Sequence, residues 1–182
     1  MRSLEEDLAA ARAYHGHLCH GMVMGVRMAR HGCRALGIDD PHTYRDLVVY
    51  VEMDRCASDA VGVVAGVTLG RRRLKWMDYG KMAATFVDLG TGAAVRLAPR
   101  PEVPHAGRHE DPLVFWNDWT DEQLFTCVPV EVKIPAEDRP GRPLRTVECA
   151  RCGEKVQDGR EVLEGEEALC RACAGDAYYK PL

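Results

Sequence analysis

The sequence has no excess of charge of either sign and few aromatic residues. Its 24 lysines and arginines nearly balance its 28 aspartates and glutamates, which leaves a formal net charge of -4. A charge this small supplies no global field that would attract nucleic acid or an acidic membrane. Aromatic residues make up only 7% of the chain, but hydrophobic residues make up 46%, which excludes a disordered chain and predicts a globular protein with a buried core.

The sequence also lacks long hydrophobic runs. No apolar stretch approaches the roughly 20 residues that a membrane-spanning helix needs, and the first residues, MRSLEEDLAAARAYHGHL, are charged rather than apolar as in a signal peptide. We therefore expect a cytoplasmic protein with no membrane partner. Eight cysteines in such a protein point to metal ligands or reactive thiols, because the reducing cytosol disfavours structural disulfides.

The length of 182 residues allows one ordinary domain and a small appendage. Residues 135–145 contain three prolines and little that is apolar, which predicts a linker. We therefore expect a main domain over residues 1–134, a linker over 135–145 and a small second domain over 146–182.

Hydrophobic periodicity predicts the elements of the main domain. Helices are expected over residues 4–13 and 22–36, and the β-branched run 47–53 is too short for a helix, so it predicts a central strand. The later predictions are a helix over 57–66, a hairpin of strands 83–89 and 93–97, an irregular loop over 99–112, a short helix over 120–125 and a strand over 128–134.

The strongest chemical signal is the spacing of four cysteines, Cys149-x2-Cys152-x17-Cys170-x2-Cys173. Two CxxC pairs at this separation are typical of a zinc ribbon, in which four thiolates surround one Zn²⁺. A unit this small buries too little surface to fold alone, so zinc should supply its folding energy. Four cysteines leave no position open for substrate, so we predict a structural site. Acidic residues surround the ribbon and argue against nucleic-acid binding.

A second group of metal-binding residue types follows the first predicted helix. The segment HGHLCH, residues 15–20, places three imidazoles and a thiol within six residues. His17 and Cys19 lie on the same side of an extended segment, so both could bind one ion. Cys56 is the natural third ligand, because it lies at a strand end and helix start where the helix dipole should lower its thiol pKa. The alternative is a capped helix start with surface histidines.

Four separated motifs make the chain resemble a known family. They are YHGHLC (14–19), followed by Gly21 and GVRMA (25–29); VEMDRCASDA (51–60); GVTLG (66–70); and DYGK (78–81). In this order the motifs resemble the E-subunit family of formylmethanofuran dehydrogenase. The resemblance covers about residues 8–134, and members of that family often carry a C-terminal four-cysteine zinc domain.

The resemblance implies an α+β fold of helix, strand, helix and three more strands around a mixed sheet, associated as a homodimer. It also implies that His17, Cys19 and Cys56 hold a second metal, and these ligand types suit Zn, Fe or Ni. The family is linked to the molybdenum or tungsten enzyme that reduces carbon dioxide onto methanofuran. That link implies a redox-enzyme partner and a place in one-carbon metabolism.

Several positions depart from the family pattern near the expected site. His20 stands where proline is usual, Val67 where a cysteine is common, and Arg72 and Arg73 replace a Gly-Asn pair. The two arginines would suit an anionic ligand such as a phosphate or carboxylate, although a solvated loop is the alternative. We predict that His15, His20 and these arginines contact a ligand.

Three further residues are expected to act in catalysis. Tyr79 and Lys81 could supply a proton donor beside the metal, and Asp59 could orient water or a ligand there. A lone lysine is otherwise a surface residue.

Three functions fit these observations. The first is a metal-dependent enzyme or ligand-handling protein, whose three-ligand site leaves a position open for water or a small ligand. The second is a non-catalytic metal carrier or docking protein of a molybdenum or tungsten enzyme. The third, a nucleic-acid-binding regulator, rests only on the ribbon and the basic stretch 71–75. An organic molecule bound beside the metal would favour the first.

Overall fold

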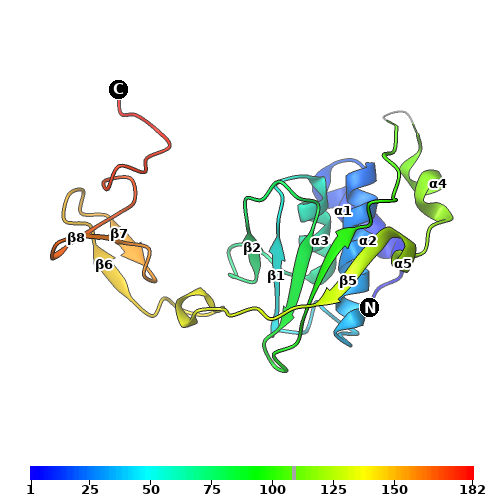
Figure 1. Ribbon diagram of the computed structural model, residues 1–182, viewed down its shortest axis with the longest axis horizontal. Helices are drawn as coiled ribbons and strands as arrows, with labels where there is room; N and C mark the ends of the chain where they lie inside the picture. Colours follow the sequence, from blue (N-terminus) through cyan, green and yellow to red (C-terminus); the bar gives the residue numbers. More distant parts are fainter. Residues whose placement is uncertain (108–109) are drawn as a thin grey trace. The chain divides into compact units, whose positions relative to one another are not determined.

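The structure, a computed structural model, describes residues 1–107 and 110–182 (Figure 1). The chain divides into two compact units, Met1–Lys133 and Ile134–Leu182. The larger unit combines helices with a five-stranded mixed sheet, which confirms the predicted α+β fold. No helix in the described part of the chain is long and apolar enough to span a membrane.

Three helices form one layer of the larger unit. Helix α1 spans Leu4–His15, α2 spans His20–Ala35 and α3 spans Cys56–Ala65. Helix α1 begins with a capping box, in which the Ser3 hydroxyl accepts from the Glu6 N–H and the Glu6 carboxylate accepts from the Ser3 N–H. Such a box fixes the first turn. The helix ends at His15, before Gly16 in the left-handed conformation, and the histidine-rich loop continues from there.

The sheet has the strand order β2-β1-β3-β4-β5. Its strands are β1 (Leu47–Val51), β2 (Leu74–Trp76), β3 (Ala84–Asp88), β4 (Ala94–Pro99) and β5 (Phe125–Pro129). Strand β2 pairs parallel with β1, whereas the other neighbours are antiparallel. The parallel pairing places Trp76 opposite Val51, at the end of β1 from which the chain continues to α3.

The helices lie together on one side of this sheet (Figure 1). Alternate strand residues such as Val49, Phe86 and Leu97 are fully buried in the core that they share with α2 and α3. Two glycines of α2 allow the close approach. A Cβ at Gly32 would lie 2.4 Å from the Phe86 ring, and one at Gly25 would lie 2.6 Å from the carbonyl oxygen at the start of α3. Helix α2 therefore packs directly against both β3 and α3.

Most elements of the main domain are where the sequence predicts them, but one strand has other bounds and two elements were not predicted. Strand β5 ends at Pro129 rather than reaching residue 134, because its pairing with β4 runs only from Phe125 to Pro129. Helix α4 (Pro112–Asn117), which Asp111 caps, begins at the end of the predicted irregular loop and was not predicted. Strand β2 begins within the basic stretch 71–75, for which no element was predicted. The predicted short helix is confirmed as α5 (Asp121–Leu124).

The smaller unit consists of two β-hairpins and a short helical turn. Its elements are η1 (Ala136–Asp138), β6 (Thr146–Glu148), β7 (Lys155–Gln157), β8 (Val162–Glu164) and β9 (Glu167–Leu169). Part of the segment predicted as a linker bonds to this unit. The Leu144 N–H donates to the Asp158 carboxylate at 2.8 Å, and the Asp158 N–H donates to the Arg145 carbonyl at 2.9 Å.

Candidate metal and ligand site

The four cysteines of the smaller unit converge on one point. The Sγ atoms of Cys149, Cys152, Cys170 and Cys173 all lie within 4.8 Å of one another. Backbone hydrogen bonds from Cys170 and Cys152 lower the pKa of the Cys149 thiol to about 6, and the Cys173 N–H donates to the Cys170 sulfur at 3.4 Å. Four thiols with N–H donors directed at sulfur fit a tetrahedral metal site without an open position.

The larger unit has its own cluster in the loop between α1 and α2. One ligating atom each from His15, His17 and Cys19 lies within 4.8 Å of the others, and the two imidazole rings have their centroids 4.8 Å apart. Gly16 between them has a φ of 92°, a left-handed conformation that favours glycine. This turn ends α1 and folds the loop so that both imidazoles approach the thiol.

Cys56 lies beside this cluster, at the first residue of α3. Its side chain contacts Cys19 through a thiol hydrogen bond. A Cβ at Gly21 would lie 3.3 Å from the Cys56 Cβ and 3.8 Å from the Cys19 sulfur, so a glycine at this point leaves the two thiols room to meet. The expectation that the helix start lowers the Cys56 pKa is wrong, because burial is the largest influence and, with Cys19, raises this pKa.

A carboxylate holds one imidazole of the cluster in place. The Asp59 carboxylate lies 2.8 Å from Nδ1 of His15, and the His15 side chain is only 17% exposed. Asp59 stands one helical turn after Cys56 on α3. A carboxylate on Nδ1 fixes the ring orientation and leaves Nε2 for a metal, as metal-bound histidines commonly require. Asp59 thus links His15 to α3, the helix that begins at Cys56.

A cavity of about 830 Å³ adjoins this group. Its size is within the range of sites for small organic molecules. The apolar part of its lining consists of Val51, Met53, Val63, Val67, Leu69 and Leu74, and the polar and aromatic part includes Tyr14, His42, Asp54, Ser58, Asp59, Arg71 and Trp76. Asp59 both lines the cavity and bonds to His15, so it connects the cavity with the metal-binding residue types.

The two predicted anion-binding arginines are placed differently from each other. Arg73 is only 4% exposed, and its guanidinium donates to the carbonyl oxygens of Tyr44 at 3.0 Å and Gly66 at 2.8 Å. This arginine therefore ties the chain before β2 to the loop after α3. Arg72 is half-buried with a left-handed φ of 59°. Neither belongs to the cavity lining, which contains Arg71 instead.

The other predicted residues lie apart from the cavity lining. Tyr79 is 58% exposed and Lys81 is exposed, and neither lines the cavity. The His20 ring packs edge-on against Phe115 and Trp116. Both ring nitrogens of His20 are buried and have no hydrogen-bond partner among the residues that the structure describes.

Sequence reasoning missed several cavity residues. Trp76 lines the cavity because β2 pairs parallel with β1, and a three-residue edge strand carries too weak a local pattern to be found. Tyr14 and Asp54 occur within the family motifs, but neither residue type by itself indicates a ligand-binding site. The signal that could have identified them is their proximity in sequence to the expected metal ligands, since Tyr14 precedes His15 and Asp54 lies two residues before Cys56.

Comparisons with known proteins agree with this architecture. The family model described as "FmdE, Molybdenum formylmethanofuran dehydrogenase operon" matches residues 14–122. A protein of Archaeoglobus fulgidus, described as a probable S-adenosyl-L-methionine-binding protein, is 29% identical over an alignment of 201 positions that covers 94% of this chain and 53% of that protein. The chain thus spans about half the length of this curated relative.

A solved structure shares the fold. The crystal structure of a tungsten formylmethanofuran dehydrogenase FmdE-like protein from Syntrophus aciditrophicus matches with a TM-score of 0.63 at 22% sequence identity. The match covers 98% of this chain and 96% of that one.

Proposed function

Starting from the fact that this chain belongs to the FmdE family, we propose that it binds a small organic ligand in the 830 Å³ cavity, beside a metal held by the larger unit. The observation that carries this proposal is the bond between Asp59 and His15, because Asp59 also lines the cavity. Occupancy of the cavity and of the metal site would then influence each other.

The metal ligands that we propose are His17, Cys19 and Cys56. The convergence of His17 with Cys19 and the contact between Cys19 and Cys56 support this set. His15 is either a fourth ligand or a neighbour that Asp59 orients. Two thiols and one imidazole suit Zn, Fe or Ni. With three protein ligands, the metal would supply an open position and a Lewis acid beside the cavity.

The lining of the cavity favours a ligand that carries charges of both signs. Asp54 and Asp59 could face a cationic group and Arg71 could face a carboxylate. Trp76 is 51% exposed at the cavity, and such an indole can stack on a flat ring. Burial lowers the pKa of His42 in the same lining, which favours its neutral, hydrogen-bonding form.

S-adenosyl-L-methionine has this chemistry: an adenine ring, a sulfonium, an ammonium and a carboxylate. The description of the Archaeoglobus relative supports this ligand. We therefore propose S-adenosyl-L-methionine, or a compound with the same groups, as the occupant of the cavity. Tyr79 and Lys81 do not line the cavity, and their catalytic role stays a prediction.

A second role, as an accessory protein of a molybdenum or tungsten enzyme, is supported by the description of the family model. In this role the smaller unit would be a docking module stabilised by Zn²⁺, and the chain would form a homodimer in the cytoplasm. Four thiols within 4.8 Å of one another support a structural zinc.

Isothermal titration calorimetry of the anaerobically purified, zinc-loaded chain with S-adenosyl-L-methionine tests the proposed ligand. We expect one binding event per chain. Trp76→Ala should weaken it roughly 5- to 150-fold, because stacking of a base on an aromatic ring contributes about 1–3 kcal/mol. Tyr179→Ala removes an aromatic side chain of similar exposure, 55%, and should leave the affinity unchanged. Absence of heat from the wild-type chain would contradict the proposed ligand.

A further inference from the structure

One end of the cavity gathers arginines. Arg71 lines the cavity, and Arg73 lies two residues further along the chain. Burial, and then the charges of Arg45 and Arg71, lower the pKa of the Arg73 guanidinium. Three guanidinium groups therefore lie close enough at this end to repel one another.

No carboxylate in the described part of the chain pairs with the two outer arginines. Arg45 and Arg71 are exposed, and neither forms an ion pair there. Arg73 donates to the carbonyl oxygens of Tyr44 and Gly66, which carry no formal charge. Such a cluster attracts an anion, and guanidinium groups bind carboxylates and phosphates through paired hydrogen bonds.

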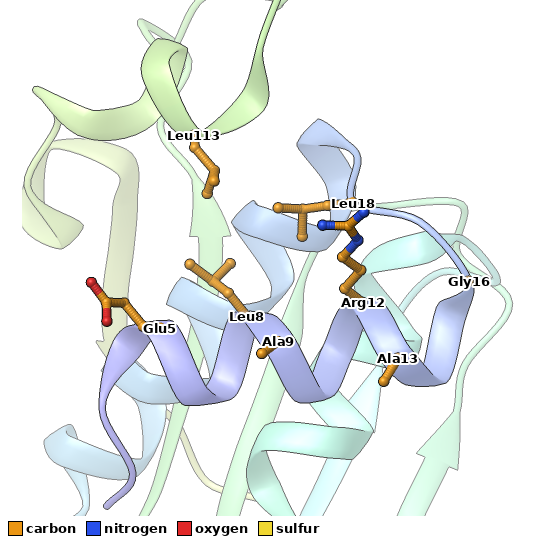
Figure 2. Close-up of a pocket in the computed structure, with 8 residues that line it drawn as sticks. All are labelled: Glu5, Leu8, Ala9, Arg12, Ala13, Gly16, Leu18 and Leu113. Atoms are coloured by element: carbon orange, nitrogen blue, oxygen red, sulfur yellow. The ribbon is translucent and has the colours of Figure 1, made fainter.

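The groove along α1 has a different charge pattern. It has a volume of about 550 Å³, and its lining contains Glu5 and Arg12 beside mainly apolar residues such as Leu8 and Leu113 (Figure 2). The charges of Glu5 and Arg12 have opposite signs, so they offset each other. The cavity is therefore the better candidate for binding an anion.

Helix α3 places the arginines away from the metal-binding residue types. The cavity lining follows one face of this helix, from Asp59 through Val63 to Gly66 just after its end. Asp59 and Gly66 are seven residues apart, which is about 10 Å along a helix axis. Asp59 bonds to His15, whereas Gly66 accepts from Arg73 at 2.8 Å. The two ends of the cavity thus carry opposite charges.

Strand β2 gives the same direction. The Arg73 carbonyl, just before β2, accepts from the Val49 N–H at 2.8 Å. Trp76, at the end of β2, pairs with Val51 at the end of β1, from which the chain continues to α3. Trp76 therefore lies toward the metal end of the cavity, and Arg71 lies toward the other end.

We propose that Arg71, assisted by the charge of Arg45, binds the carboxylate of the cavity ligand, while its adenine ring stacks on Trp76 toward the metal. This inference rests on the proposed function and adds the orientation of the ligand. The carbonyl end of α3 carries partial negative charge, which suits the ammonium group beside that carboxylate. The metal then faces the nucleoside half of the ligand rather than its amino-acid half.

Titration calorimetry of the zinc-loaded chain with two probes tests the carboxylate subsite. The probes are S-adenosyl-L-methionine and 5′-methylthioadenosine, which keeps the nucleoside but lacks the amino-acid group. Arg71→Ala should weaken the first about tenfold or more, because hydrogen bonds between charged groups are strong, and should leave the second unchanged. Trp76→Ala should weaken both alike. Arg142→Ala, at an exposed arginine of the smaller unit, is the matched control.

The outcomes separate this inference from the proposed function. Arg71 is exposed, so its variant should fold, and thermal unfolding verifies this. Equal losses for both probes in Arg71→Ala, or no loss for either, would overturn the subsite and leave the proposed ligand standing. Absence of heat from wild type with both probes would overturn both. Adenosine 5′-monophosphate that binds more tightly than S-adenosyl-L-methionine, and depends on Arg71, would replace the carboxylate by a phosphate.

Proton relaxation of S-adenosyl-L-methionine bound to the Co²⁺-substituted chain tests the orientation directly. Relaxation by a paramagnetic ion falls steeply with distance, so the adenine protons should relax faster than the proton beside the carboxylate. Cys19→Ser, which should lack the second metal, provides the background from the ribbon. Faster relaxation of the amino-acid protons would overturn the orientation.

Discussion

The two clusters of sulfur and nitrogen ligands differ in what positions them. In the smaller unit, four thiols are held by three-residue strands, and Cys149, Asp158 and Leu169 are its buried residues among those described. In the larger unit, the cluster lies where two helix starts meet above a continuous apolar core. We therefore expect the first cluster to need a metal in order to fold, and the second to be built by packing before any metal binds.

We expect this difference to separate a structural metal site from a reactive one. A metal that supplies the folding energy is enclosed by ligands from its own small unit. A metal site whose ligands are already held in place by packing can leave one coordination position open without losing its shape. Substitutions that disturb one unit and spare the other therefore test the contrast.

The largest effect should follow from Cys152→Ser. Three thiolates would remain in the ribbon, and metal binding to small zinc units contributes on the order of 10 kcal/mol to their folding. We expect residues 146–173 to lose protection from amide hydrogen exchange while the larger unit keeps it. Cys127→Ser, at a thiol outside both clusters, is the control. A ribbon that stays protected in the Cys152 variant would show that it folds without a complete metal site.

Gly25→Ala should affect the larger unit alone. Its Cβ would lie 2.6 Å from the Ala57 carbonyl oxygen and 2.8 Å from the Ala60 Cβ, so α2 and α3 would be forced apart. Overpacking of this kind costs about 1–3 kcal/mol of the free energy of unfolding. Gly70→Ala is the control, because nothing lies within 4 Å of a Cβ there. Equal thermal unfolding midpoints for both variants would contradict the close packing of these helices.

Asp59→Asn should have a smaller effect, confined to the second metal. The neutral amide loses the charge-assisted bond to His15 Nδ1, and loss of such an orienting carboxylate typically lowers metal affinity 10- to 100-fold. Asp54→Asn removes another carboxylate of the cavity that has no bond to His15. Competition with a chromophoric zinc chelator measures both affinities. Equal affinities would mean that Asp59 does not position the ligand set.

Much of this structure follows from local sequence patterns. The apolar spacing of α1, α2 and α3 and the glycine turn between β3 and β4 identify those elements, because their residues interact within a few positions of one another. The ribbon cysteines are identified by spacing alone. Asp111 followed by Pro112 is likewise a local helix-start signal, and it would have identified α4.

Other features depend on pairing between distant segments. Strand β2 has three residues and forms because Leu74 meets Val49 across the sheet. Arg73 looks like a surface cation in the sequence, but its hydrogen bonds to Tyr44 and Gly66 bury it. The position of Trp76 in the cavity depends on the same pairing. Such contacts carry no local signal, so the cavity could not be predicted, although the cluster beside it could.

The most direct test of the second metal site is the metal content of anaerobically purified variants, measured by elemental analysis. We expect two equivalents per chain for wild type and for Cys127→Ser, and one equivalent for Cys19→Ser and for Cys56→Ser. Cys19 belongs to both ligand sets that the geometry allows, so two equivalents in Cys19→Ser would contradict the site altogether. Two equivalents in Cys56→Ser with one in His15→Ala would contradict Cys56 as a ligand and assign that position to His15.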